Sequence, residues 1–215
     1  MDPEKRDATQ AGYDAVAEEY ATRFFDELAA KPLDRALLEC LVEMTRGLGI
    51  IADIGCGPGQ IARYLTDHGA EAMGIDLSPE MVKLAQRLSP DIPFHVGDML
   101  ALDLDINSLG GIAAFYSVIH APPEQIRQVM REFYRVLHPG GLALLAFHVG
   151  DEVKHLEEWW EKAVSLDFHF YQPATLALRM EEAGFRIEAK IERAPYVGSV
   201  EHPSQRGYLL ARKPE

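Results

Sequence analysis

The chain has few cysteines, no long apolar run and little positive charge. Its only two cysteines are Cys40 and Cys56, which indicates neither a disulfide framework nor a Cys-x-x-Cys metal site. The apolar stretches are too short to span a bilayer as a helix. The first seven residues are charged and lack the apolar core of a secretory signal. We therefore expect a cytoplasmic protein with no membrane partner and no bound metal.

The charge balance argues against one class of partner. Lys and Arg number 21 against 34 Asp and Glu, which gives a net charge of −13 over 215 residues. Proteins that bind nucleic acids usually carry a basic surface for the phosphates, so no nucleic-acid partner is expected. The excess of acidic residues instead predicts a well-solvated surface. The length suits one α/β domain that can bury its own core.

Apolar periodicity predicts alternating strands and helices. Two amphipathic helical runs come first, from Ala8 to Ala30 and from Leu33 to Met44. Short apolar strands are then expected at 50–54, 72–76, 92–96, 111–117 and 142–147, with helical patterns after the first, second and fourth. Repeated βα units of this kind imply right-handed crossovers and a mostly parallel sheet.

The last third of the chain departs from this rhythm. The pattern predicts an extra helix over 151–166, in which Trp160 falls in phase with Leu156 and packs inward. Another helix is expected over 175–183. Two closing strands follow, at 185–192 and 207–212.

The most informative stretch is Asp53-Ile-Gly-Cys-Gly-Pro-Gly-Gln60, which follows a short apolar strand and leads into a helix. Glycines at every second position let the backbone turn sharply and pass close to a ligand. A dinucleotide-binding turn would instead have the spacing G-x-G-x-x-G. Here the third glycine comes one residue early, and the acidic residue precedes the glycines.

This D-x-G-x-G-x-G loop resembles that of class I S-adenosylmethionine (SAM)-dependent methyltransferases, and other motifs follow in the same order. They are Gly74–Ser78, Gly97–Met99, Phe115–His120, Leu137–Gly141, and Phe170–Pro173 with Glu182–Phe185. The resemblance implies a Rossmann-like, seven-stranded, mostly parallel sheet with helices on both faces. It also implies that the final strand is inserted antiparallel between strands five and six, and that SAM is the cofactor and S-adenosylhomocysteine (SAH) the product.

On this interpretation the whole chain is one methyltransferase domain with four parts. We expect a helical cover over 1–48, a SAM-binding core over 49–147, a substrate-side insert and helix over 148–184, and closing strands over 185–215.

The cofactor-binding residues predicted from these motifs lie at strand ends and on the first helix. The resemblance implies that Asp76 accepts the ribose hydroxyls and that Asp98 accepts from the adenine amino group, while Tyr13 and Tyr20 are either core residues or a cover over SAM. The full predicted set is Tyr13, Tyr20, Asp53, Gly55, Cys56, Gly57, Gly59, Gln60, Asp76, Leu77, Ser78, Met81, Gly97, Asp98, Met99 and Ser117.

Methyl transfer needs a general base only when the accepting atom carries a proton at neutral pH. His120 and His148 are the candidate bases, since both are expected at the ligand edge of the sheet, although a histidine there can equally be structural. Trp159, His169 and Tyr171 are the candidate substrate contacts, because the segment is rich in aromatic and histidine side chains that suit a small flat or apolar molecule.

The sequence therefore predicts a methyltransferase that acts on O, N or C of a small molecule, as a monomer or homodimer. A non-catalytic SAM-binding or partner-binding protein on the same fold stays open, since fold does not fix function. A nicotinamide-dependent oxidoreductase is disfavoured by the loop spacing. It is also disfavoured because Tyr116 and Tyr134 are followed at the fourth position by histidine rather than lysine.

Overall fold

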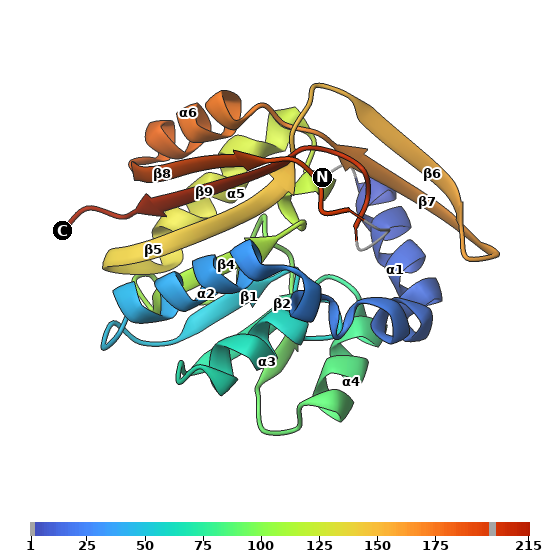
Figure 1. The fold of residues 1–215 in the computed structure, drawn as a ribbon, viewed down its shortest axis with the longest axis horizontal. Helices are drawn as coiled ribbons and strands as arrows, with labels where there is room; N and C mark the ends of the chain where they lie inside the picture. Colours follow the sequence, from blue (N-terminus) through green and yellow to red (C-terminus); the bar gives the residue numbers. More distant parts are fainter. Residues whose placement is uncertain (1–2, 198–200) are drawn as a thin grey trace.

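A seven-stranded sheet forms the centre of the computed structural model, which describes residues 3–197 and 201–215 (Figure 1). Its strand order is β3-β2-β1-β4-β5-β9-β8. The strands are β1 (Ile51–Ile54), β2 (Ala72–Asp76), β3 (Phe94–Val96), β4 (Leu109–Phe115), β5 (Leu137–His148), β8 (Arg186–Arg193) and β9 (Arg206–Arg212). The first five run parallel, and β9 lies antiparallel between β5 and β8. The predicted Rossmann-like architecture is confirmed, including the insertion of the last strand.

Helices cover both faces of this sheet. They are α1 (Pro3–Phe24), α2 (Pro32–Met44), α3 (Gln60–Asp67), α4 (Pro79–Leu88), α5 (Pro123–Val136) and α6 (Pro173–Ala183), with short 3₁₀ turns η1 (Glu27–Ala30) and η2 (Val118–His120). Successive residues of β4 pack on opposite faces of the sheet, because neighbouring side chains of a strand point in opposite directions. Ile112 and Ala114 pack with α5 and α6, whereas Ala113 packs with α2 and α3.

The helix after β2 begins where the sequence predicted. Ser78 has extended backbone angles, and its hydroxyl accepts from the backbone N–H of Met81 at 3.1 Å, with Pro79 in the first turn. This cap satisfies one of the free N–H groups at the helix start. It fixes α4 beside the carboxyl end of β2.

The helix predicted over 151–166 is wrong. The segment is a two-stranded antiparallel hairpin of β6 (Val153–Trp159) and β7 (Lys162–His169), which lies beside α1 (Figure 1). Trp160 and Glu161 form its turn with φ of +49° and +62°. Leu156 pairs across the hairpin with buried Leu166, and Trp160 is half-buried at the turn instead of packing inward as a helix residue.

Within the described ranges, no helix is both long and apolar enough to cross a membrane.

Candidate active site

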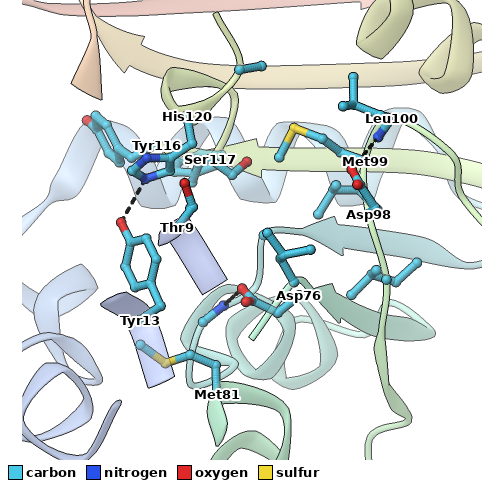
Figure 2. Close-up of a pocket in the computed structure, with 18 of the residues that line it drawn as sticks. Thr9, Tyr13, Asp76, Met81, Asp98, Met99, Leu100, Tyr116, Ser117 and His120 are labelled. Atoms are coloured by element: carbon cyan, nitrogen blue, oxygen red, sulfur yellow. Dashed lines mark hydrogen bonds between the residues drawn. The ribbon is translucent and has the colours of Figure 1, made fainter. Parts of the chain in front are cut away.

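A cavity lies at the carboxyl ends of β1, β2 and β4, which is where ligands bind in open α/β sheets (Figure 2). It is covered by α1, and we call it the cofactor cavity. Its lining residues are Thr9, Tyr13, Tyr20, Ile54, Gly55, Gly57, Ile75, Asp76, Leu77, Met81, Gly97, Asp98, Met99, Leu100, Phe115, Tyr116, Ser117, His120 and Ala121. Most of the predicted cofactor-binding residues are therefore brought together here.

The glycine loop is tied to Asp76 at the end of β2. One carboxylate oxygen accepts from the backbone N–H of Gly57 at 2.8 Å (Figure 2). The other accepts from the backbone N–H of Ser78, also at 2.8 Å. Burial raises the pKa of Asp76 above its usual range, and these two N–H groups act in the opposite direction. Each oxygen keeps a further lone pair, so the carboxylate can still accept from a ligand.

Gly55 must be a glycine in this loop. Its φ is +74°, and a Cβ placed on it would lie 2.2 Å from the Cβ of Ser117. A side chain would therefore force Ser117, just before η2, away from the loop. The backbone of β1 and the start of η2 approach each other closely as a result, and Ser117 reaches the cavity wall with its hydroxyl buried and without a hydrogen-bond partner among the described residues.

Asp98 forms the far wall of the cofactor cavity. One carboxylate oxygen accepts from the N–H of Leu100 at 2.9 Å, and the other accepts from Arg6 Nε of α1, also at 2.9 Å. The cavity holds only about 90 Å³ with α1 in this position. The first turns of α1 therefore close it on the Asp98 side.

His120 at the end of η2 is held in one tautomer. Its Nδ1 lies 3.0 Å from the backbone carbonyl of Asp167, which can only accept, so Nδ1 carries the proton. Nε2 then presents its lone pair and accepts from the Tyr13 hydroxyl at 2.7 Å (Figure 2). Burial lowers the pKa of His120 to about 4, which keeps the ring neutral near pH 7.

A second cavity of about 560 Å³ shares Tyr13, Tyr20 and Tyr116 with the first. We call it the acceptor cavity. It lies between α1, the β6–β7 hairpin and the segment before β9. Its other lining residues are Phe24, Glu27, Lys31, Ile119, His148, Lys154, His155, Leu156, Trp159, Phe168, Phe170, Glu201, His202 and Arg206. One part of its wall is aromatic and another is charged.

His148 at the end of β5 has the opposite tautomer to His120. The Arg206 guanidinium, which can only donate, donates to its Nδ1, so the ring proton is on Nε2. Burial and the positive charge of Arg206 lower the pKa of His148 to about 3, so the ring is neutral. Its ring also stacks on Phe170, with centroids 4.8 Å apart. The geometry favours a hydrogen-bond donor at this position over the predicted base.

Five predicted cofactor residues do not line either cavity: Asp53, Cys56, Gly59, Gln60 and Ser78. Asp53 is buried beneath the loop, where it accepts from the N–H of Ala62 in α3 at 3.2 Å, and burial raises its pKa to about 8. Gly59 packs on Phe94, whose ring atoms would lie 2.7 Å from a Cβ. These two residues shape the loop from behind.

Of the three predicted substrate contacts, only Trp159 lines the acceptor cavity. Tyr171 is a buried core residue that donates to the carbonyl of Ala121. His169 lies with Lys5 and His155 around a third cavity, of about 170 Å³, which is also lined by His120.

Sequence reasoning missed Lys31, Tyr116 and Arg206. Tyr116 stands in a recognised motif and could have been found there, but the two cations carry no local signal.

Comparison with known proteins agrees with this geometry. Residues 51–141 match the family model described as a methyltransferase domain. The chain is 28% identical over 160 residues to malonyl-[acyl-carrier protein] O-methyltransferase of Enterobacter lignolyticus, covering 74% of this chain and 61% of that protein. It is 36% identical over 96 residues to demethylmenaquinone methyltransferase of Chlorobaculum parvum, covering 44% of this chain and 39% of that one. The chain thus spans less than two thirds of the length of these relatives.

Among solved structures, the DhpI–SAH complex superposes with a TM-score of 0.75 over 97% of both chains at 19% identity. This likeness supports the fold. The segment 51–141 thus matches a methyltransferase domain, and the chain has the fold of class I SAM-dependent methyltransferases.

Proposed function

We propose that this chain transfers a methyl group from SAM to an O, N or C atom of a small-molecule acceptor. The observation that carries the proposal is the pair of adjacent cavities, which share three lining tyrosines. The first is lined by the glycine loop, Asp76 and Asp98, and it meets the second at Tyr13, Tyr20 and Tyr116. A cofactor and an acceptor would therefore lie next to each other at these three residues, which we call the tyrosine wall. An in-line displacement requires such proximity.

The residues of the cofactor cavity fit SAM by their chemistry. Asp76 and Asp98 are ionisable acceptors for the ribose hydroxyls and the adenine amino group, and the buried Ser117 hydroxyl has no partner in the described chain. Gly57, with a φ of +52°, leaves the loop backbone open to the cavity. When bound, SAM supplies an electrophilic methyl group on a positively charged sulfur.

His120 and Tyr13 form a proton path from the tyrosine wall. An acceptor hydroxyl beside Tyr13 can give its proton to the tyrosine oxygen, while the tyrosine proton moves to Nε2 of His120. The carbonyl of Asp167 then holds the other nitrogen of the ring and keeps it oriented. This arrangement suits an acceptor that carries a proton at neutral pH, such as a phenol.

Helix α1 excludes water from this wall and has to move for the cofactor to enter, because the closed cavity holds only about 90 Å³. Its contacts across the opening are polar: Arg6 with Asp98, Lys5 with Asp167 at 3.4 Å, and Asp14 with the Ser78 hydroxyl at 2.5 Å. The two ion pairs are partly exposed and contribute little stability, so the first two turns of α1 are its least tightly held part.

An acceptor screen tests the proposed function. The purified protein is incubated with SAM and panels of phenols, quinols and amines, and SAH formation is followed by mass spectrometry. We expect SAH to form with one acceptor class only. SAH binding without turnover on any panel would favour the non-catalytic SAM-binding protein instead.

A further inference from the structure

The acceptor cavity has N–H groups with no hydrogen-bond partner among the described residues. Its two carboxylates, by contrast, are already paired with cations. We propose that it binds a hydroxyaromatic carboxylate, whose ring lies on the aromatic wall and whose carboxylate is held by Lys31 and His148. The inference rests on the proposed function and names the class of its acceptor.

Lys31 is the first of these donors. It stands just before α2 and is buried, with 5% of its side chain exposed. Within the described chain, Glu27 is the only hydrogen-bond partner of its ammonium group, at 2.6 Å. An ammonium group has three N–H bonds, so two remain for a ligand. The group also lies 5.5 Å from the centre of the Tyr116 ring, at the wall between the two cavities.

His148 is the second donor. Its Nδ1 is occupied by Arg206 and by the Ser204 hydroxyl at 2.8 Å, which leaves Nε2–H as its free polar group. Its ring centroid lies 5.2 Å from that of Tyr116. Lys31 and His148 therefore both flank the same tyrosine and can donate to one acidic group placed beside it.

The two carboxylates in the lining, Glu27 and Glu201, are already paired with cations. Glu201 is engaged by Arg193 at 2.5 Å, by Arg206 at 3.2 Å and by the N–H of Tyr196 at 2.7 Å. Glu27 takes Lys31 on one oxygen and Gln60, at 3.4 Å, on the other. A ligand that brings oxygen acceptors is matched here, whereas one that brings an amine would meet N–H groups.

The aromatic part of the wall suits a flat apolar body. Trp159 meets the rings of Tyr13 and Tyr20 edge-on, with centroids 5.9 and 5.7 Å apart, and Phe168 and Phe170 continue the surface. The volume of about 560 Å³ is ample for a fused two-ring molecule. Its hydroxyl would then be the group that faces Tyr13 and His120.

The test uses two ligands that differ only in the charged group, 6-hydroxy-2-naphthoate and 6-hydroxy-2-naphthamide. Each is titrated calorimetrically into the wild-type protein, with and without saturating SAH. We expect the carboxylate to bind about tenfold more tightly than the amide, because it accepts two charge-assisted or buried hydrogen bonds. Equal affinities, or binding of neither ligand, would overturn the proposal.

Variants locate the preference in the cavity. Lys31→Met should remove most of the preference, because it should weaken binding of the carboxylate ligand and leave binding of the amide ligand unchanged. His148→Phe removes the ring N–H, keeps the stack on Phe170 and leaves Lys31 in place. This variant should also reduce the preference for the carboxylate. Lys190→Met, at an exposed position of the edge strand β8, is the matched control and should keep it. A full preference in both cavity variants would contradict the assignment.

The outcomes also separate this inference from the proposed function. Failure of SAH itself to bind would count against the methyltransferase. SAH binding with no preference for the carboxylate would count against the acceptor class alone.

Discussion

The cofactor cavity and the acceptor cavity lie side by side but are assembled in different ways. The groups that line the first are mostly the loops that leave consecutive parallel strands, from Ile54 to Ala121, with α1 as a cover. The second draws on segments far apart in the chain: α1, the residues around Lys31, the end of β5, the β6–β7 hairpin and the segment before β9. A ligand site made at strand ends can be recognised from local motifs, whereas one made by packing cannot.

The two histidines show the same contrast in chemistry. His120 presents a lone pair toward Tyr13, since a carbonyl oxygen holds its other nitrogen. His148 presents an N–H, since a guanidinium occupies its other nitrogen. Identical side chains after adjacent strands therefore present opposite hydrogen-bonding groups because of their partners alone, which fits the roles proposed for them.

The largest expected effect comes from His120→Gln. Glutamine can accept from Tyr13 and donate to the Asp167 carbonyl, so it imitates the geometry without taking up a proton. Turnover should fall by roughly 10²- to 10⁴-fold while SAH affinity is kept, which steady-state kinetics and calorimetry would check. His138→Gln, at an exposed residue that bonds its neighbour's carbonyl, is the control. Unchanged turnover would remove His120 as the base.

Asp76→Asn should act on the other cavity. The substitution removes the negative charge of a group that accepts from the Gly57 N–H and is proposed to accept from the ligand. SAH affinity should therefore fall by roughly 10- to 100-fold. Calorimetry measures this, with the exposed Asp103→Asn as the matched variant. Equal SAH affinity in the two variants would refute the role given to Asp76.

Trp159→Ala should lower kcat/KM for the acceptor by about tenfold through lost apolar contact. The neighbouring Trp160 stacks on Trp159 with ring centroids 4.6 Å apart but does not line the cavity. Trp160→Ala should therefore change kcat/KM much less. Equal losses in the two variants would indicate that the hairpin acts through its stability instead.

A further expected effect is on pH-dependent stability. The pKa of His120 is about 4 in the folded protein and about 6.5 when unfolded, so the folded ring binds fewer protons between these values. Stability due to this ring is present above about pH 6.5 and is lost as pH falls toward 4, by up to about 1.4 kcal/mol per pH unit.

Urea unfolding of wild type and His120→Gln at about pH 7.5 and about pH 5 measures this difference. The free energy of unfolding of the wild type should decrease more on acidification than that of the variant. Parallel decreases would show that the ring is not held neutral by burial.

The parallel half of the sheet was predictable because each element has its own local signal. Ser78 and Pro79 mark the start of α4, and the apolar runs mark the buried strands. The resemblance added the antiparallel last strand, which periodicity alone does not define. Asp53 was predicted as a ligand contact, yet it lies behind the loop and bonds α3. Sequence spacing does not show which side of a turn a carboxylate faces.

The β6–β7 hairpin was mistaken for a helix for a physical reason. Leu156, Trp160 and Ala163 fall at helical spacing, and the turn at Trp160 and Glu161 lacks the Asn-Gly signal usual for such hairpins. Its strands are stabilised by each other and by packing against α1, contacts that a local pattern does not contain. Lys31 and Arg206 were missed for the same reason.

The most direct test of the central claim is calorimetric titration of the purified protein with SAM, SAH and NAD in parallel. The account predicts saturable binding of SAM and SAH and none of NAD. Silence from both adenosyl compounds, in folded protein shown to be free of copurified ligand, would contradict it.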